Sequence, residues 1–374
     1  MSGMAPHALL PKQNSEERAR HAFLIELKNV LTQDILAGVR DAYENEVKPD
    51  FEAEHGRPPA NRHEVADALS DHPAYQMWSA LGRIQQDLYV DSTAACVERQ
   101  LPKLVETYRE LAAAPKHGAL RLSHNMTPPR YISAIDIHRI PGGYFFERGV
   151  DDVYVGARYD IGSFIFGRGQ RGPMNDTRGQ TGVAYVKRVW PDLAPKRILD
   201  MGCTAGMNTL PYVDAFPDAE VHGIDVSAPA LRYAHGRSEA LGRAVQFSQQ
   251  DAESTDFEDA SFDLVVSHIL LHESSRQAVQ NFFKECHRLL KPGGHMLHLD
   301  VPRRLTCTEP FDQFIADWDT DNNNEPFWGA FLFDMDIREA AIEAGFATED
   351  VREELTHTPS RKSQYWALSA TKRA

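Results

Sequence analysis

Two glycines and a series of acids follow apolar runs in the second half of the chain. The segment RILDMGCTAG, residues 197–206, passes from an apolar run to Gly202 and Gly206, which permit a tight turn and a close approach of backbone to a ligand. Asp225 ends a second apolar run about twenty residues later, where an acid commonly accepts hydrogen bonds from ribose hydroxyls. Asp251 ends a third run, where its carboxylate can accept a hydrogen bond from an adenine amino group. This order of residues predicts a binding site for a nucleoside.

Two further residues indicate whether the predicted ligand is a dinucleotide or a nucleoside without phosphate. Thr204 interrupts the G-x-G-x-x-G spacing, in which the second glycine makes room for a pyrophosphate. Asp200 adds a negative charge beside the loop, which would repel a pyrophosphate and attract a cationic or amine-bearing ligand. Asp200 can alternatively bond the loop amides, and the sequence leaves both roles open. The pattern favours an adenosine that carries a positively charged amino-acid tail.

The segment SHILLHES, residues 267–274, holds the candidate catalytic residues. His268 and His272 are candidate general bases because imidazole titrates near neutral pH, and Glu273 is placed to orient either one. For His268, a histidine bonded to backbone at the end of a strand is an equal alternative. A two-histidine metal site would need both residues on one helix, and no third ligand is evident, so we expect no metal.

Alternating strands and helices after residue 196 must position these side chains. We expect strands in the segments RILDMG, EVHGIDVS, VQFSQQDA, FDLVVSHIL and HMLHLDVP, with helices in NTLPYVDAF, PALRYAHGRSEALG and AVQNFFKECHRLL. Strands that alternate with helices predict an α/β fold with a doubly wound parallel sheet. In such a sheet the ligand lies outside the carboxyl ends of the strands, where the order of the strands reverses.

The first half of the chain is organised differently. Residues 1–125 have apolar positions at three- and four-residue steps, which predict a mainly α-helical N-terminal domain that serves packing, dimerisation or as a lid. Residues 126–180 are predicted to be a connector in loops, because the segment is rich in glycine and aromatic residues; within it, IPGGYFFE is predicted to turn between two extended runs. Tyr159 and Asp160 of this connector are predicted to fold over the ligand. Residues 181–374 hold the predicted ligand-binding domain.

Composition and charge exclude several classes of function. The chain has 374 residues, of which 42% are hydrophobic and 25% charged, as in an ordinary globular protein, and no apolar run is long enough to span a bilayer. The first residues do not have the pattern of a secretory signal, so we expect a cytoplasmic protein without membrane contact. The formal net charge of −14 argues against nucleic acid as a partner. The four cysteines show no paired spacing, which argues against a zinc ribbon or a disulfide framework.

At these residues the sequence resembles the class I S-adenosylmethionine-dependent methyltransferases. The matches are Asp200, Gly202, Gly206, Asp225 and Asp251 in the family's order, together with the segments SFDLVVSHILLHE and LLKPGGHMLHLD. The resemblance implies the Rossmann-like doubly wound sheet of this family and S-adenosyl-L-methionine as cofactor. It assigns the ribose to Asp225, the adenine to Asp251 and Ala252, and the methionine part to the backbone around Gly202 and Gly206. The complete set implied to bind the cofactor is Asp200, Gly202, Cys203, Thr204, Gly206, Asp225, Val226, Asp251, Ala252 and Ser267.

The predicted function is therefore methyl transfer to a small-molecule acceptor by in-line displacement. The sequence does not say whether oxygen, sulfur or nitrogen is methylated; for a hydroxyl acceptor, His272 would remove the proton. Two alternatives stay open, a nicotinamide-dependent oxidoreductase and a non-catalytic binding protein that keeps the fold. A homodimer through the N-terminal helices is a further expectation.

Residues 301–336 interleave acids with aromatic residues. In the family this connection often forms part of the substrate lid, and aromatic faces beside carboxylates would favour a cationic substrate or product. An equal alternative is a solvated acidic loop whose aromatic side chains lie in a core.

Overall fold

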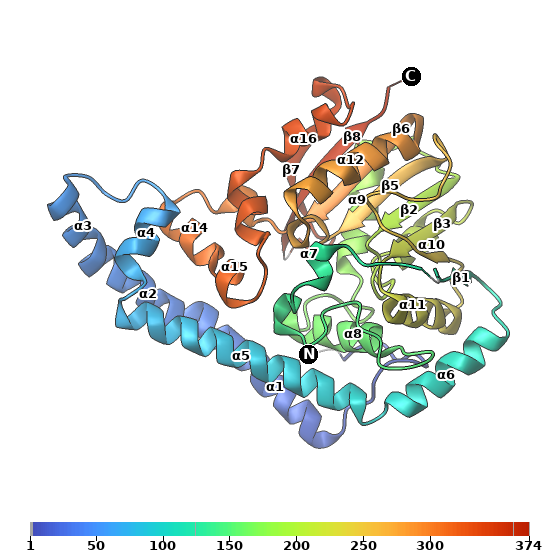
Figure 1. Cartoon of the computed structure of the whole chain (residues 1–374), viewed down its shortest axis with the longest axis horizontal. Helices are drawn as coiled ribbons and strands as arrows, with labels where there is room; N and C mark the ends of the chain where they lie inside the picture. The colour runs from blue at the N-terminus through green and yellow to red at the C-terminus, as the bar shows by residue number, and fades with distance from the viewer. Residues whose placement is uncertain (1–2, 124, 362, 374) are drawn as a thin grey trace.

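The computed structural model describes residues 3–123, 125–361 and 363–373. Within these residues lies a sheet of eight strands in the order β1-β4-β3-β2-β5-β6-β8-β7 (Figure 1). The strands are β1 (Ala119–Arg121), β2 (Arg197–Met201), β3 (Glu220–Asp225), β4 (Gln246–Gln249), β5 (Phe262–His268), β6 (Leu290–Asp300), β7 (Arg352–His357) and β8 (Gln364–Thr371). Neighbouring strands are parallel except at β8, which runs antiparallel to both β6 and β7. The α/β doubly wound sheet predicted from the sequence is confirmed.

The order of the sheet reverses beside β2. From β2 the chain proceeds outward through β3 to β4, and it then returns to place β5 on the other side of β2. In register, Ile198 of β2 pairs with Val221 of β3 and with Leu264 of β5. The carboxyl ends of β2, β3 and β5 therefore meet at one edge with a crevice between them, which is where ligands of such sheets bind.

Helices cover both faces of the sheet because neighbouring residues of a strand point to opposite sides. Ile198 packs with Tyr185 and Leu231 on one face, and Leu199 packs with Phe282 on the other. The first face carries α9 (Thr177–Val189), α10 (Leu210–Ala215) and α11 (Ala228–Leu241), and the second carries α12 (Arg276–Leu289) and α16 (Ile337–Glu343).

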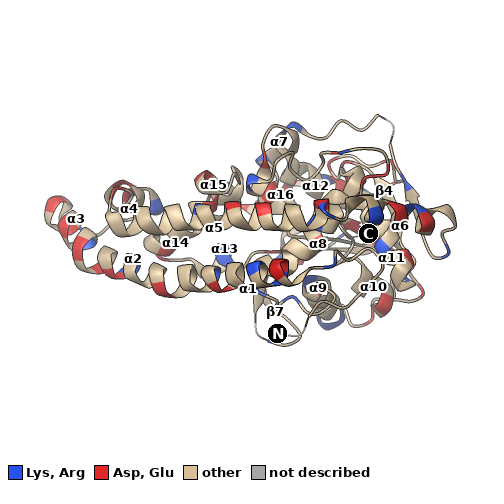
Figure 2. Ribbon diagram, turned by 90° about the horizontal axis from the view of Figure 1, so that it is seen from below, with Lys and Arg blue, Asp and Glu red and all other residues tan. Residues whose placement is uncertain are grey.

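Helices from the first half of the chain form an arm that projects from the sheet (Figures 1 and 2). One continuous helical run contains α1 (Ser15–Val30), η1 (Leu31–Ile35), α2 (Leu36–Ala42), η2 (Tyr43–Val47) and α3 (Lys48–His55). It begins with a capping box, in which Asn14 accepts a hydrogen bond from the Glu17 backbone N–H and the Glu17 side chain accepts one in return. The chain returns through α4 (Arg62–Leu69) and α5 (Pro73–Glu98), which lies alongside this run.

The connection after β6 also belongs to the arm. It folds into α13 (Arg303–Thr306), α14 (Pro310–Ala316), α15 (Trp318–Asn322) and η5 (Ala330–Asp334). Phe311 and Phe314 are buried in a core that includes Trp78 of α5, and Asp317 pairs with Arg62 at 2.9 Å. These aromatic side chains therefore lie in a core, as the second interpretation of residues 301–336 expected, and Asp317 is engaged in an ion pair.

One strand lies inside residues 1–125, which were predicted to be mainly helical. α6 (Leu101–Ala113) ends before β1, which pairs in parallel with β4 at the edge of the sheet. The Glu239 carboxylate of α11 anchors the segment directly before β1. It accepts hydrogen bonds from the backbone N–H groups of Lys116 and Gly118, each at 2.7 Å. This strand could not be predicted from the sequence, because three residues are too few to show an alternating pattern.

The glycine-rich connector contains a buried helix, α8 (Tyr154–Phe166), where the sequence predicted loop. A Cβ atom on Gly156 would lie 2.3 Å from Cβ of Tyr233 in α11, and one on Gly162 would lie 2.5 Å from the hydroxyl of Tyr89 in α5. The two glycines therefore let α8 pack closely between α11 and α5. The prediction of loop was wrong because the energy of this close packing outweighs the low helix propensity of glycine.

Short elements complete the chain. They are α7 (Arg130–Ser133), η3 (Ile137–Arg139), η4 (Leu271–Glu273) and η6 (Thr348–Asp350). The segment IPGGYFFE forms a turn as predicted, but the 3-10 helix η3 precedes it where an extended run was expected. No helix in the described part of the chain is long and apolar enough to cross a membrane.

Candidate active site

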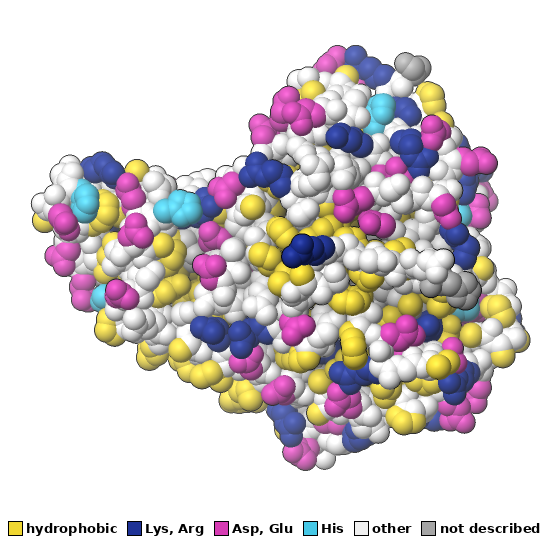
Figure 3. All heavy atoms as spheres, viewed as in Figure 1, with side chains coloured by type: hydrophobic (Ala, Val, Ile, Leu, Met, Phe, Trp, Pro, Cys, Tyr) yellow, Lys and Arg dark blue, Asp and Glu magenta, His cyan; other side chains and the backbone are white. Residues whose placement is uncertain are grey.

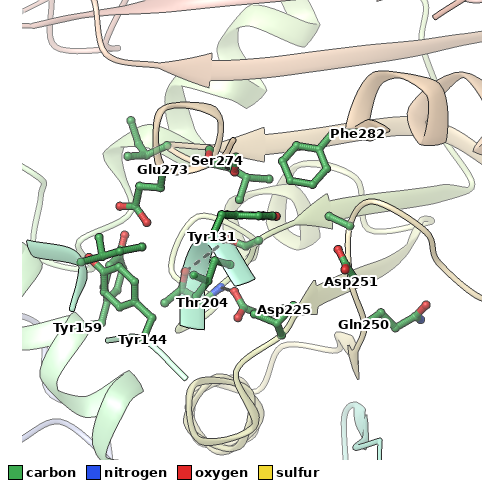
Figure 4. Close-up of a pocket in the computed structure, with 17 residues that line it drawn as sticks. Tyr131, Tyr144, Tyr159, Thr204, Asp225, Gln250, Asp251, Glu273, Ser274 and Phe282 are labelled. Atoms are coloured by element: carbon green, nitrogen blue, oxygen red, sulfur yellow. Dashed lines mark hydrogen bonds between the residues drawn. The ribbon is translucent and has the colours of Figure 1, made fainter. Parts of the chain in front are cut away.

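A cavity lies at the carboxyl ends of β2, β3 and β5 (Figure 4). It leaves about 740 Å³ free of protein atoms, counting the part open to solvent. Tyr131 and Asp251 also line a surface groove beside α7, where Figure 3 shows exposed apolar side chains. The residues that line the cavity are Tyr131, Ile132, Ile137, Tyr144, Tyr159, Gly202, Thr204, Asp225, Val226, Gln250, Asp251, Ala252, Ile269, Leu270, Glu273, Ser274 and Phe282.

The loop after β2 brings backbone to the wall of the cavity. Gly202 and Gly206 have φ angles of 69° and 70°, and Thr204 has 47°. A Cβ atom on Gly202 would lie 2.8 Å from Leu270, so glycine is required there for both conformation and space. The left-handed conformation is unfavourable for a β-branched residue such as Thr204, and structures keep such strain mainly where a ligand is bound.

Asp225 stands at the centre of the cavity, at the end of β3 (Figure 4). Its two carboxylate oxygens accept hydrogen bonds from the backbone N–H groups of Thr204 at 3.0 Å and Ser227 at 2.9 Å. Burial raises the pKa of Asp225 to about 6, although these backbone donors act in the opposite direction. Each oxygen keeps a further lone pair, so the carboxylate can still accept hydrogen bonds from the hydroxyl groups of a ligand.

Asp251 lies at one end of the cavity, close to the end of β4 (Figure 4). One of its oxygens accepts a hydrogen bond from the Glu253 backbone N–H at 2.9 Å, and burial raises its pKa. Ala252, Gln250 and Phe282 complete this end. The combination of apolar surface with a carboxylate and an amide suits a flat heterocycle that bears an amino group.

The opposite end is built by the connector, and the sequence revealed only part of it. Tyr144 and Tyr159 line the cavity with ring centroids 5.9 Å apart, beside Glu273 (Figure 4). Sequence reasoning pointed to Tyr159 but missed Tyr144 and Tyr131. The aromatic residues of the connector were the available signal, but nothing in the sequence showed which of them turn toward the cavity.

His138 adds an ionic cluster directly behind this end. Its Nε2 lies 3.1 Å from an oxygen of Glu273, and its Nδ1 lies 2.8 Å from an oxygen of Glu325. Burial opposes a charge on the ring, but Glu325 and Glu273 raise the pKa of His138 well above its usual value. His138 is thus in contact with two carboxylates that favour its charged form, and one of them lines the cavity. This cluster could not be recognised from the sequence, because its three members lie far apart along the chain.

A family profile described as "Methyltransferase domain" matches residues 198–294, which contain the loop after β2, Asp225, Asp251 and Glu273. Residues 198–294 form a class I methyltransferase domain. The resemblance predicted from the sequence is confirmed for this part of the chain.

The chain is similar to several known proteins over stretches of different length. The demethylmenaquinone methyltransferase of Thermus thermophilus is 36% identical over 109 residues, which cover 29% of this chain and 49% of that protein. Phosphoethanolamine N-methyltransferase 1 of Arabidopsis thaliana is 28% identical over 208 residues, covering 53% and 39%. The structure of Haemonchus contortus phosphoethanolamine N-methyltransferase 2 in complex with S-adenosyl-L-methionine has a TM-score of 0.40 at 22% identity, covering 51% of this chain and 52% of that one. The chain matches less than half the length of these two curated relatives.

S-adenosyl-L-methionine is the cofactor of the methyltransferase domain, and the cavity fits it. Asp225, Asp251 and Glu273 bring three carboxylates to the cavity, and the described lining includes no lysine or arginine. This lining suits a ligand with a positive charge and no phosphate. The close backbone at Gly202 leaves room that a side chain would fill. The lining thus agrees with the expectation that the ligand is not a dinucleotide.

Other predicted residues of the methyltransferase domain lie behind the wall. Asp200 accepts a hydrogen bond from the Thr209 hydroxyl at 2.6 Å, and its other oxygen lies 3.3 Å from Nδ1 of His268. Nε2 of His268 lies 3.2 Å from the hydroxyl of Tyr212. Among the described residues that line the cavity, Asp200, Cys203, Gly206, Ser267 and His268 are not found. These buried side chains hold the loop and the strand ends in place.

His272 also lies behind the wall of the domain. Its Nδ1 is 2.5 Å from an oxygen of Asp300, and its ring packs edge-on against Trp328 with centroids 4.8 Å apart. Burial acts against a charge, but the Asp300 carboxylate raises the pKa of His272. Its Nε2 lies 3.8 Å from an oxygen of Glu273. Of the three predicted catalytic residues, Glu273 lines the cavity. His272 contacts Glu273 from behind and does not line the cavity.

In the part of the chain that the structure describes, no group of three or more histidine, cysteine or acidic side chains is arranged to hold a metal ion.

Proposed function

We propose that the protein transfers a methyl group from S-adenosyl-L-methionine to a small-molecule acceptor. The observation that carries this proposal is the position of three acids along one cavity, with Asp251 at one end, Asp225 at the centre and Glu273 at the other end (Figure 4). We refer to the part lined by Gly202, Thr204, Asp225 and Asp251 as the cofactor half. The acceptor half is the end lined by Tyr144, Tyr159 and Glu273, with His138 and Glu325 behind it.

In the cofactor half, each residue has a separate task. Asp225 accepts hydrogen bonds from the ribose hydroxyls, and Asp251 with Ala252 faces the adenine. The backbone of Gly202 and Thr204 lies against the amino-acid part. S-adenosyl-L-methionine supplies, when bound, an electrophilic methyl group on a positively charged sulfur.

In the acceptor half, we assign the catalytic role to Glu273. Its carboxylate lines the cavity and is fixed by His138 at 3.1 Å. It provides negative charge beside the site of reaction, and it can take up a proton from an acceptor that has one to lose. His272 is a positioning residue, because it is held by Asp300 and contacts Glu273 without lining the cavity. Most of the rate enhancement would come from holding the two reactants in contact and in line.

Calorimetry and a turnover assay test the function. We expect the purified chain to bind S-adenosylmethionine and S-adenosylhomocysteine and not to bind NADH. A chain that binds NADH and ignores the other two would contradict the proposal. We further expect S-adenosylhomocysteine to accumulate with at least one member of a panel of small hydroxy, amino and thioether compounds. Cofactor binding without turnover across the panel would favour the non-catalytic alternative.

A specific observation favours a homodimer through the arm. Met77, Ile84 and Leu88 of α5 are 54%, 51% and 43% exposed, and their spacing places them on one side of the helix. Such a stripe of exposed apolar residues suits contact with a second copy of the chain. Light scattering should give the mass of a dimer for the wild type and of a monomer for Ile84→Glu. A monomeric wild type would exclude this arrangement.

The cysteines agree with the proposed cytoplasmic location. All four are free thiols in the structure, and Cys96, Cys203 and Cys286 are buried. Free thiols persist in a reducing compartment.

A further inference from the structure

Three cations gather beside the acceptor half without carboxylate partners. Lys28 lies on α1, Arg171 follows α8, and Arg178 lies on α9. Arg178 is 8% exposed, and its Nε has no hydrogen-bond partner. In the described part of the chain, none of the three forms a salt bridge, whereas the nearby Arg303 pairs with Asp319 at 3.4 Å. A buried cation is normally paired, so this arrangement calls for an explanation.

Two of the three cations lie against the same aromatic side chain. Nζ of Lys28 lies 3.1 Å from the centroid of the Phe166 ring, and Cζ of Arg171 lies 5.7 Å from the same centroid. The ring of His138 lies 6.4 Å from Phe166, which connects this cluster to the imidazolium behind Glu273. Lys28 on α1 and Arg171 in the turn after α8 therefore lie against the same ring, although they are distant in the sequence.

Arg178 connects the cluster to the cavity itself. The hydroxyl groups of Tyr159 and Tyr365 lie beside its guanidinium group, and Tyr159 lines the cavity. Tyr365 precedes Trp366, which pairs with Asp300 at the carboxyl end of β6. Tyr159 thus links Arg178 to the acceptor half of the cavity.

The local electrostatics show that these cations repel one another. Burial lowers the pKa of Lys28 to about 7, and Arg171 adds to the effect. Burial also lowers the pKa of Arg171 to about 10, and Arg178 adds to it. Asp319 counteracts the shift at Lys28, but it is already paired with Arg303. An anion bound among these side chains would relieve the repulsion and supply the missing hydrogen-bond acceptor.

We propose that Lys28, Arg171 and Arg178 bind an anionic group of the methyl acceptor, a carboxylate or a phosphate. The proposal rests on the function proposed above and narrows its substrate class. Arg171 and Arg178 supply planar donors suited to such oxygen groups, and Lys28 supplies a point charge. The remainder of the acceptor then extends past Tyr159 toward Glu273, where the methyl group is received.

The test measures anion binding directly, using thermal unfolding at constant ionic strength. Sodium phosphate or sodium acetate replaces sodium chloride in a titration of the wild type, Arg171→Gln and the control Arg83→Gln, whose parent side chain is exposed on α5. We expect a saturable rise of the unfolding temperature for the wild type and the control. In Arg171→Gln the midpoint should shift to at least about tenfold higher concentration. The same variant should be more stable than the wild type in chloride alone, because it removes a partly buried charge that has no carboxylate partner.

The arms of the experiment separate the possible outcomes. A response to phosphate alone indicates a phosphate ester, and a response to acetate indicates a carboxylate. The proposal is overturned if the wild type shows no saturable response to either anion, or if Arg171→Gln responds as the wild type does. Should Arg171→Gln not fold, Lys28→Met tests the same cluster from α1. S-adenosylhomocysteine binding, measured separately by calorimetry, should be unchanged in every variant. If the wild type does not bind S-adenosylhomocysteine, the proposed function is overturned but the anion site is not.

Discussion

The cofactor half of the cavity comes from one stretch of the chain, residues 202–252, whereas the acceptor half is assembled from segments spread over most of its length. In the cofactor half, the loop after β2, Asp225 and Asp251 follow successive strands of one sheet. In the acceptor half, Tyr159, Glu273 and Glu325 come from the connector, the segment after β5 and the connection after β6. Strand ends can converge only at one edge of a sheet, while added helices can meet in many ways. The fold therefore determines the structure of the cofactor half, whereas the acceptor half is free to specify an acceptor.

The largest expected effect concerns the cofactor half alone. Asp225→Ala removes the acceptor of two backbone N–H groups and of the ribose hydroxyls. Loss of hydrogen bonds to a charged group costs about 1.5–3 kcal/mol each, so calorimetry should show S-adenosylhomocysteine binding at least about a hundredfold weaker. Asp218→Ala, at an exposed position, is the control. Unchanged affinity in Asp225→Ala would remove the ribose role, and the anion response of the acceptor half should persist in it.

The next effect concerns the acceptor half alone. Glu273→Gln keeps the shape of the side chain but removes the charge beside the site of reaction, so turnover should fall about a hundredfold. Affinity for S-adenosylhomocysteine should change by no more than a few-fold. His272→Gln, which disturbs Glu273 only from behind, should lower turnover less. Steady-state kinetics on the first acceptor found would show this order, and equal losses in both variants would place His272 in direct contact with the acceptor.

The same division explains what could be predicted from the sequence. Asp225 and Asp251 were recognisable because a strand ends in a fixed direction, so an acid directly after it must face the crevice. His138 was not recognisable, because it has a left-handed φ of 55° in a segment without a repeating pattern, and its partners are remote in the sequence. Asp200 was recognised as part of the loop. The sequence could not decide whether it attracts the ligand or bonds the loop amides, because these two roles differ only in the direction of its side chain.

Packing of α8 shows why the connector was misread, and it offers a test of how the two halves are joined. Gly156→Ala would place a methyl group 2.3 Å from Cβ of Tyr233, so it should destabilise the fold by about 1–3 kcal/mol. The matched control is Gly38→Ala in α2, where no atom lies within 4 Å and where alanine should stabilise the helix by about 0.5–1 kcal/mol. Denaturant unfolding measures both variants. Equal effects of both substitutions would show that the contact between α8 and α11 is loose.

The smallest effect, a dependence on pH, separates the halves without any change of their shape. Because burial raises the pKa of Asp225 to about 6, the free site is protonated below that pH, and binding to the carboxylate must release a proton. Affinity for S-adenosylhomocysteine should therefore fall by up to about tenfold for each pH unit below 6 and level off above it.

The same carboxyl should act on stability in the opposite direction. An acid whose pKa is higher in the folded than in the unfolded chain binds its proton more tightly in the fold, so its contribution to stability is lost as the pH rises toward 6. In Asp225→Asn the position cannot titrate, so the pH dependence of both affinity and stability attributed to it should disappear. If the slope of affinity below pH 6 persists in that variant, the proton belongs to a group of the acceptor half, and the two halves are coupled rather than independent.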